Sequence, residues 1–360
     1  MLKILITGVT GQDGYNMVAF LLKQPLKYDI YGGYNNKLVD DPLLNNIKLI
    51  KLDLSNNENI EYCFKSILPD YFINFAGAQP QFEKNNIKMF QINTLSTIFI
   101  LDCILKYNPN CKYFSAGSCM EYDISTSTST STSTFDPTST FDSIPAFDST
   151  IDPNSSSNST INSNSIGIIN IDTLTQPNTP YGISKLANRH LVEYYRNKFN
   201  IFAIHAILFN HDSYRRTEHF ILKKIINHLQ IIKAGKIITP IVCENIDICK
   251  DWSDSRDFIE AIWLMLNHSV PLTYILSSGK LNSLINFINI VCKYLNINTV
   301  WKEDNNKLLL YHNNNIILIG KHSKDNIFII GNNNETKKLL NWNPHITFEK
   351  MIFDMIFNDS

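Results

Sequence analysis

A glycine-rich turn near the amino end constrains this chain more than any other feature. The chain begins MLKILITGVTGQDG, in which an apolar run is followed by Gly8, Gly11 and Gly14 at every third position. A helix-like segment begins directly afterwards, so the turn lies between an expected strand and an expected helix. Glycines at this spacing permit a tight turn, let backbone N–H groups approach a pyrophosphate, and direct the positive end of the helix toward it. We therefore expect a Rossmann-type α/β fold that binds a dinucleotide.

Short apolar runs alternate with helix-length amphipathic segments through the first half of the chain. This alternation favours a doubly wound parallel sheet with helices on both faces. A serine- and threonine-rich tract follows, which we expect to be disordered because it has too few apolar residues to bury a core. Helix and strand patterns near the end are sufficient for a smaller C-terminal α/β lobe. The expected divisions are a Rossmann domain at 1–123 and 172–270, with some segments after 210 joining the smaller lobe, an insertion at 124–171, and the smaller lobe at 271–360.

The composition argues against several kinds of partner. Among the 360 residues, 32 are basic and 33 acidic, and a net charge of −1 gives no general attraction for nucleic acid or a membrane surface. The seven cysteines are scattered without a CxxC pair, which favours reduced thiols over disulfides or a metal site. The first residues read as a buried strand rather than a signal peptide, and no apolar run reaches bilayer length. We expect a cytoplasmic protein whose partner is a small molecule.

Two further strand ends would complete a dinucleotide site. KLDLS places Asp53 and Leu54 where they could flank an adenine, and NFAGAQ follows another expected strand. An acidic residue at the end of the second strand normally binds the ribose hydroxyls of NAD, whereas an arginine there binds the extra phosphate of NADP. This chain has YGGYNNK at that place, with neither residue type and with Lys37 as the nearby cation. NADP is therefore slightly favoured, and NAD remains open.

A tyrosine and a lysine four residues apart are the strongest catalytic candidates. YGISK places Tyr181 and Lys185 on one face of an expected helix. A nearby ammonium favours the phenolate of a tyrosine, which is otherwise a poor base at neutral pH. Such a pair can take a proton from a sugar or alcohol hydroxyl while hydride passes to the cofactor. Ser118, in YFSAGSCMEY, is placed to hydrogen-bond the reacting oxygen.

The sequence resembles the extended short-chain dehydrogenase/reductases, and among them the GDP-mannose 4,6-dehydratases. The resemblance covers nearly the whole chain outside the serine-rich tract and rests on ITGVTGQDG, AGSCMEY, PYGISKLANRHLVEYY, AILFNHDSYRR, NIDICKDW and LLNWNP. It implies that the tyrosine removes the proton of the sugar's 4-hydroxyl while hydride goes to NADP. A glutamate then removes the acidified carbon-bound proton, the 6-hydroxyl leaves as water, and the hydride returns to carbon 6. The resemblance also implies a homodimer or homotetramer whose smaller lobe binds the nucleotide sugar.

By matching position, the resemblance implies roles for individual residues. The redox chemistry belongs to Ser118, Tyr181 and Lys185. Tyr181 and Lys185 also contact the cofactor, and the other cofactor contacts are Gly8, Gly11, Gln12, Asp13, Gly14, Asp53, Leu54, Ala76, Leu208, His211 and Arg216. The residues expected to contact the nucleotide sugar are Asn210, Lys224 and Lys250.

Departures from the family pattern leave the reaction open. Met120 stands where the dehydratases carry their catalytic glutamate, and Glu121 follows one place later. Because one step along a strand turns a side chain to the other face, Glu121 replaces the missing base only if the strand bulges or has ended. Lys250 stands where the family has an arginine, which loses a bidentate grip on a diphosphate. Three interpretations remain: a GDP-mannose 4,6-dehydratase with Glu121 as its base, a related nucleotide-sugar epimerase or reductase, and a non-catalytic homologue.

Overall fold

The structure is a computed structural model that describes residues 1–35, 40–122, 165–236, 239–323 and 326–358. Most of the serine-rich tract lies outside the described residues, and so does Lys37. The expectations about that tract and about Lys37 therefore stay predictions.

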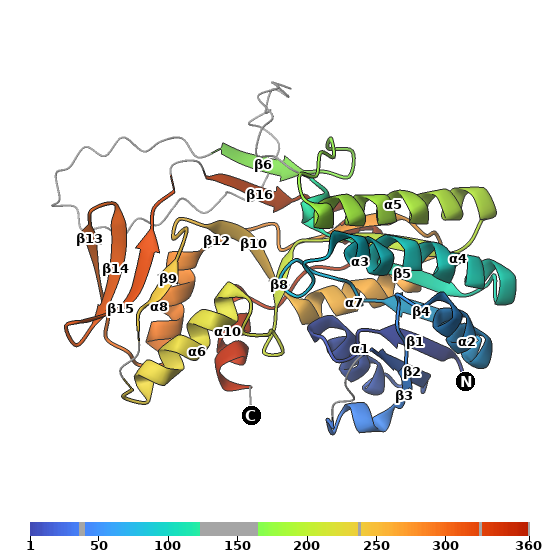
Figure 1. Cartoon of the computed structure of the whole chain (residues 1–360), viewed down its shortest axis with the longest axis horizontal. Coiled ribbons are helices and arrows are strands. Elements are labelled where there is room, and N and C mark those ends of the chain that lie inside the picture. Colours follow the sequence, from blue (N-terminus) through green and yellow to red (C-terminus); the bar gives the residue numbers. More distant parts are fainter. Residues whose placement is uncertain (36–39, 123–164, 237–238, 324–325, 359–360) are drawn as a thin grey trace.

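A seven-stranded parallel sheet forms the centre of the larger lobe (Figure 1). Its order is β11-β7-β5-β4-β1-β2-β3, and every neighbouring pair is parallel. The strands are β1 (Lys3–Thr7), β2 (Asp29–Tyr34), β3 (Lys48–Lys51), β4 (Tyr71–Asn74), β5 (Lys112–Ala116), β7 (Ala203–Leu208) and β11 (Thr273–Leu276). Because the strand order runs outward from β1 in both directions, the sheet has the doubly wound, Rossmann-type topology that the sequence predicts. The predicted fold class is confirmed.

Helices cover both faces of this sheet. They are α1 (Gln12–Leu22), α2 (Asn57–Ile67), α4 (Ser96–Tyr107), α5 (Pro180–Phe199) and α7 (Ser255–Leu266). α1 and α7 pack together on one face around a shared apolar core, and α2, α4 and α5 pack around a second core on the other. α5 begins where Thr179 accepts a hydrogen bond from the Gly182 N–H and Pro180 occupies the first turn, as helix starts favour.

One helical segment of the larger lobe has the length of a membrane span. It runs from Asn86 to Tyr107 and joins α3 (Asn86–Phe90), a π-helical turn (Gln91–Leu95) and α4. Its length and composition correct the expectation that no apolar run of the chain reaches bilayer length. Half of the most apolar window is buried inside the fold, where α4 packs against α2 and α5, as a core helix does.

The edge strand β11 corrects the expected division of the chain. The expected smaller lobe covers 271–360, but Thr273 pairs with His205 and Leu276 with Leu208 in the main sheet. A four-residue apolar run identifies a strand but does not say which sheet accepts it.

The smaller lobe has its own apolar core. Its elements are α6 (Ile221–Lys233), β9 (Ile241–Cys243), α8 (Leu284–Tyr294), β13 (Val300–Asp304), β14 (Lys307–His312), β15 (Asn315–Lys321) and α10 (Phe348–Phe357). The strands form a sheet in the order β13-β14-β15-β9, and α6, α8 and α10 contact one another beside it (Figure 1).

Two small sheets lie between the lobes. One contains β8 (Asn210–Asp212), β10 (Cys249–Asp254) and β12 (Leu281–Ser283), and the other contains β6 (Ser165–Ile169) and β16 (Ile327–Gly331), which leads into α9 (Asn334–Leu340). β6 falls within 124–171, where the sequence analysis expects a disordered insertion. The end of that segment is an ordered strand because SIGII is apolar enough to pair in parallel with IFIIG of β16.

Candidate active site

The glycine turn between β1 and α1 is shaped for a phosphate group. Gly8 has a φ of +72°, which favours glycine, and its carbonyl accepts a hydrogen bond from the Gly11 N–H at 2.9 Å. A Cβ on Gly14 would lie 2.3 Å from the Gly8 carbonyl oxygen, so α1 can begin this close to the strand only with glycine there. Gly11 caps α1 without a side chain, which leaves the first N–H groups of the helix available to an anion. These residues fit the pyrophosphate of a dinucleotide.

Gly11→Val should abolish cofactor binding and leave the fold nearly intact. A Cβ at Gly11 meets only the Gly8 carbonyl oxygen, at 3.3 Å, so the added methyl groups extend into the space that a pyrophosphate would occupy. Gly14→Ala is the contrasting variant, because its Cβ clashes inside the turn and should lower the melting temperature. Equilibrium titration with NADPH and a thermal melt of both proteins check this prediction. A folded Gly11→Val protein with parental affinity would contradict it.

Three other predicted cofactor residues follow the carboxyl ends of β4 and β3, on the same side of the sheet as the glycine turn. The Ala76 N–H, after β4, donates to Thr7 Oγ1 at 3.1 Å, which holds this loop against the glycine turn. Asp53 and Leu54 follow β3. The Asp53 carboxylate accepts hydrogen bonds from the backbone and the hydroxyl of Ser55, at 2.9 and 2.7 Å, and Leu54 is buried.

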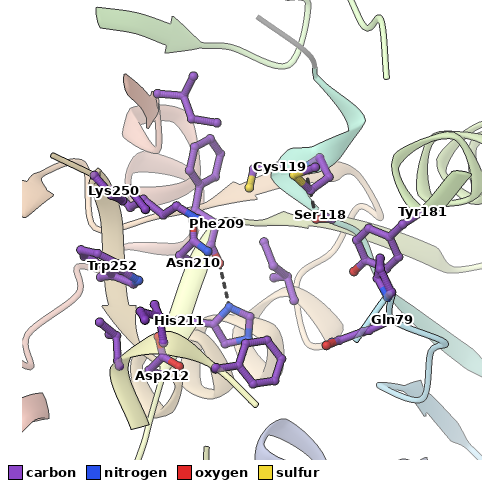
Figure 2. A pocket seen from close by; sticks show the side chains of 18 of the residues that line it. Gln79, Ser118, Cys119, Tyr181, Phe209, Asn210, His211, Asp212, Lys250 and Trp252 are labelled. Carbon is purple, nitrogen blue, oxygen red and sulfur yellow. Dashed lines mark hydrogen bonds between the residues drawn. The ribbon is translucent and has the colours of Figure 1, made fainter. Parts of the chain in front are cut away.

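A cavity of about 730 Å³ opens beside this edge, between the two lobes (Figure 2). Its volume is within the usual range for small-molecule sites. The predicted site residues that line it are Asp13, Ser118, Tyr181, Leu208, Asn210, His211, Arg216 and Lys250. The predicted residues outside its lining are Gly8, Gly11, Gln12, Gly14, Asp53, Leu54, Ala76, Glu121, Lys185 and Lys224.

Tyr181, Ser118 and Lys185 come together at one wall of the cavity. Tyr181 lies in the first turn of α5 and Ser118 just after β5, and Figure 2 shows the tyrosine side chain directed into the cavity. Lys185 is buried one helical turn later, with its Nζ 5.8 Å from the centre of the Tyr181 ring. The ammonium donates a hydrogen bond to the Ala116 carbonyl at 2.8 Å, which ties α5 to the end of β5.

Burial acts on both ionisable members of this group. It raises the pKa of Tyr181 to about 12, although the Ser118 hydroxyl and the Arg216 charge oppose the rise. It lowers the pKa of Lys185 to about 8, although the Glu121 and Asp13 carboxylates oppose the fall. At neutral pH the lysine is therefore still a cation beside the tyrosine. That is the arrangement that favours a phenolate when a second positive charge arrives.

Asp13 and His211 form a pair across the start of α1. His211 Nε2 lies 3.1 Å from an Asp13 carboxylate oxygen, and its Nδ1 lies 2.7 Å from the Phe209 carbonyl oxygen (Figure 2). Both partners accept hydrogen bonds, so a protonated imidazole satisfies both contacts. Burial alone would lower the pKa of His211, but the Asp13 carboxylate outweighs it and raises that pKa. Burial would likewise raise the pKa of Asp13, and the His211 charge lowers it.

The residues expected to contact the nucleotide sugar do not all reach the cavity. Asn210 on β8 and Lys250 on β10 line it (Figure 2). Lys224 is exposed on α6, outside the lining. Arg216, expected at the cofactor, packs its guanidinium 3.5 Å from the centre of the Phe220 ring. Its Nε lies 2.7 Å from an oxygen of the Asp212 carboxylate without hydrogen-bond alignment.

Met120 and Glu121 lie on opposite sides of a 3₁₀ turn that follows β5. The strand has therefore ended, which is one of the conditions under which Glu121 was expected to reach the substrate. Yet Met120 lines the cavity, and Glu121 is fully buried outside it. The Glu121 Oε1 accepts a hydrogen bond from the Ser118 N–H at 2.9 Å and lies 2.9 Å from His205 Nε2. This placement contradicts the expectation that Glu121 replaces the eliminating carboxylate.

Two residues in this region have no predicted role. Gln79 lines the cavity in the loop after β4, and its signal was its place just beyond a strand end. His205 is fully buried in the middle of β7, and its signal was a lone polar residue within the apolar run IFAIHAILF.

Comparison with known proteins agrees with this architecture. A dTDP-glucose 4,6-dehydratase from Bacillus anthracis, solved with NAD, superposes with a TM-score of 0.70 at 18% identity and covers 99% of this chain and 96% of its own. A UDP-glucose 4-epimerase from Thermotoga maritima superposes with a TM-score of 0.74 at 13% identity. The match covers 99% of this chain and 98% of the epimerase. GDP-mannose 4,6 dehydratase 1 of Arabidopsis thaliana is 27% identical over 376 residues, which span 99% of this chain and 89% of that protein.

Two family models match the sequence. A model of the NAD dependent epimerase/dehydratase family matches residues 4–143. The model described as GDP-mannose 4,6 dehydratase matches residues 162–355, which is more than half of the chain. With its Rossmann-type sheet and the tyrosine and lysine at the wall of the cavity, this chain belongs to the GDP-mannose 4,6-dehydratase family.

Proposed function

We propose that this chain oxidises the 4-hydroxyl of GDP-mannose with NADP as hydride acceptor and carries the sugar on to the dehydrated 4-keto-6-deoxy product. The observation that carries the proposal is the convergence of Ser118, Tyr181 and Lys185 beside a cavity of suitable size. Family membership supports GDP-mannose as the sugar nucleotide. The lack of an acidic residue at the end of β2 supports NADP over NAD.

Each of the three residues has a separate task in the oxidation at carbon 4. A nicotinamide cofactor would take hydride from carbon 4 of the sugar and return it later. Tyr181, as phenolate, removes the hydroxyl proton, and Ser118 donates a hydrogen bond to the reacting oxygen. Lys185 stabilises the phenolate through its positive charge. The Asp13–His211 pair lies beside the first turn of α1 and holds the cavity wall next to the pyrophosphate site.

A reaction without elimination is a second candidate, and Met120 favours it. A thioether cannot accept a proton at neutral pH, so Met120 cannot act as the eliminating base. Two carboxylates lie among the described residues of the lining, and they pair with positively charged partners, Asp13 with His211 and Asp212 with Arg216. A nucleotide-sugar 4-epimerase or 4-reductase needs the redox residues alone, and the chain has them.

Incubation of the protein with GDP-mannose and NADP, followed by mass spectrometry of the nucleotide sugar, tests these proposals. Loss of one water supports the dehydratase, and an unchanged mass with a new sugar supports an epimerase. A reductase would consume NADPH when a 4-keto sugar nucleotide is supplied. Tyr181→Phe protein is the control for each assay. If none of these substrates turns over while NADPH still binds, the enzyme proposal is wrong and the non-catalytic interpretation takes its place.

A further inference from the structure

A buried chain of hydrogen bonds lies directly behind the redox residues. Glu121 and His205 are both fully buried and lie 2.9 Å apart, from Oε1 to Nε2. His205 Nδ1 lies 3.3 Å from the Ser115 hydroxyl oxygen, which accepts a hydrogen bond from the Asn188 amide at 3.0 Å. Asn188 is one turn beyond Lys185 on α5. These hydrogen bonds thus connect β5, β7 and α5 beneath the cavity wall.

Capping of the 3₁₀ turn accounts for one oxygen of the Glu121 carboxylate, and packing gives no reason for the other. Its second oxygen, Oε2 of Glu121, has no hydrogen-bond partner among the described residues, and burying a charge in this way is costly. Gly117 makes room for the pair, since a Cβ there would lie 2.6 Å from the Glu121 carboxylate and 2.3 Å from His205 Nε2. Two apolar side chains would fill such a space at lower cost.

The position of the carboxylate suggests what it does. Its Oε1 accepts the Ser118 N–H, and the Lys185 ammonium donates to the Ala116 carbonyl, two residues earlier. The same short segment of backbone therefore holds the buried carboxylate and the lysine. We propose that Glu121, held in place by His205, is a positioning residue whose negative charge keeps the Lys185 ammonium protonated; this rests on the proposed redox role of Lys185.

The surrounding charges are consistent with this role. The tautomer of His205 that donates from Nε2 to Glu121 and accepts at Nδ1 from the Ser115 hydroxyl satisfies both contacts of the ring. Burial lowers the pKa of Lys185 to about 8, and Glu121 and Asp13 are the groups that oppose it. The titratable and charged groups that face the Glu121 carboxylate are His205, Lys185, Cys119, Tyr181, Tyr122 and Arg189.

Direct titration of Lys185 tests the proposal. The Nζ resonance in protein labelled with ¹⁵N-lysine, assigned by its loss in Lys185→Met, reports the protonation of this one side chain. Glu121→Gln keeps the size of the side chain and an acceptor for Ser118, and it should lower the titration midpoint of Lys185 by about half a pH unit or more. Glu193→Gln, the same change in a carboxylate on α5 that pairs with Arg189, should leave the midpoint in place. An unchanged midpoint in Glu121→Gln would overturn the proposal.

A second variant keeps the test decisive if Glu121→Gln does not fold. In the double variant Glu121→Leu, His205→Leu both polar partners are removed together, so neither is left buried and unpaired. It should fold and show the same lowered midpoint, and a parental midpoint would again overturn the proposal. Because the titration needs no substrate, its result is independent of the turnover assay. A parent protein that fails to turn over any of the sugar nucleotides would defeat the proposed function and leave the titration to decide the role of Glu121.

Discussion

Tyr181→Phe should slow turnover of GDP-mannose by ~10²–10⁴-fold, the usual loss when a positioned proton-transfer group is removed. The phenylalanine retains the ring that borders the cavity and the contact with the Lys185 ammonium, so the fold should be kept and NADPH affinity should change little. What disappears is the Tyr181 hydroxyl, which interacts with the Ser118 side chain and is the group that we propose takes the sugar proton. Single-turnover formation of NADPH from enzyme, NADP and GDP-mannose measures the step directly.

The matched control for this prediction is Tyr195→Phe. It removes a tyrosine hydroxyl from the same helix, but that hydroxyl donates to Asp102 on α4, away from the cavity. Its turnover should stay near the parental value. If Tyr181→Phe were also to retain parental turnover in a folded protein, another group would have to remove the sugar proton. The redox assignment of Tyr181 and Lys185 would then be wrong.

The sequence could predict the parts of this molecule that depend on local patterns. The glycine spacing and the alternation of apolar runs led to the doubly wound sheet, because a tight turn and a strand–helix repeat are local properties. The helix of Tyr181 and Lys185 was predictable for the same reason, since four-residue spacing defines a helix face. The lobe that receives β11, and the partner of β6, depend on pairings with distant strands and could not be read locally.

The site was less predictable where it depends on tertiary contacts. Asp13 and His211 are 198 residues apart, and nothing in either neighbourhood indicates that they pair. The largest error concerns Glu121, because the local sequence shows two possible backbone paths but not which side chains lie behind the turn. A buried histidine on β7 provides a polar partner in the core, so the carboxylate turns inward and the methionine faces the cavity.

Met120→Glu should raise the yield of dehydrated sugar on the order of 10²-fold or more, the scale of one positioned general base. Met120 is 43% exposed and lines the cavity, so a carboxylate there needs no burial of charge. The turn that carries it is packed against the start of α5, since a Cβ at Gly182 would lie 2.2 Å from the Met120 carbonyl oxygen. Met120 and Tyr181 line the same cavity, so a glutamate at 120 would face the space in which we propose that the sugar is oxidised.

Met120→Gln is the control for Met120→Glu. Glutamine has nearly the same size and shape as glutamate, but its amide cannot act as a base. The control should match the parent in C4 oxidation and gain no dehydration, while Met120→Glu releases sugar that has lost one water and leaves no NADPH behind. If the parent already dehydrates GDP-mannose as fast as Met120→Glu, the eliminating base is a different residue. If Met120→Glu oxidises carbon 4 and still expels no water, the missing base is not the sole reason why dehydration fails. An epimerase or reductase activity would then explain the site better than a dehydratase activity.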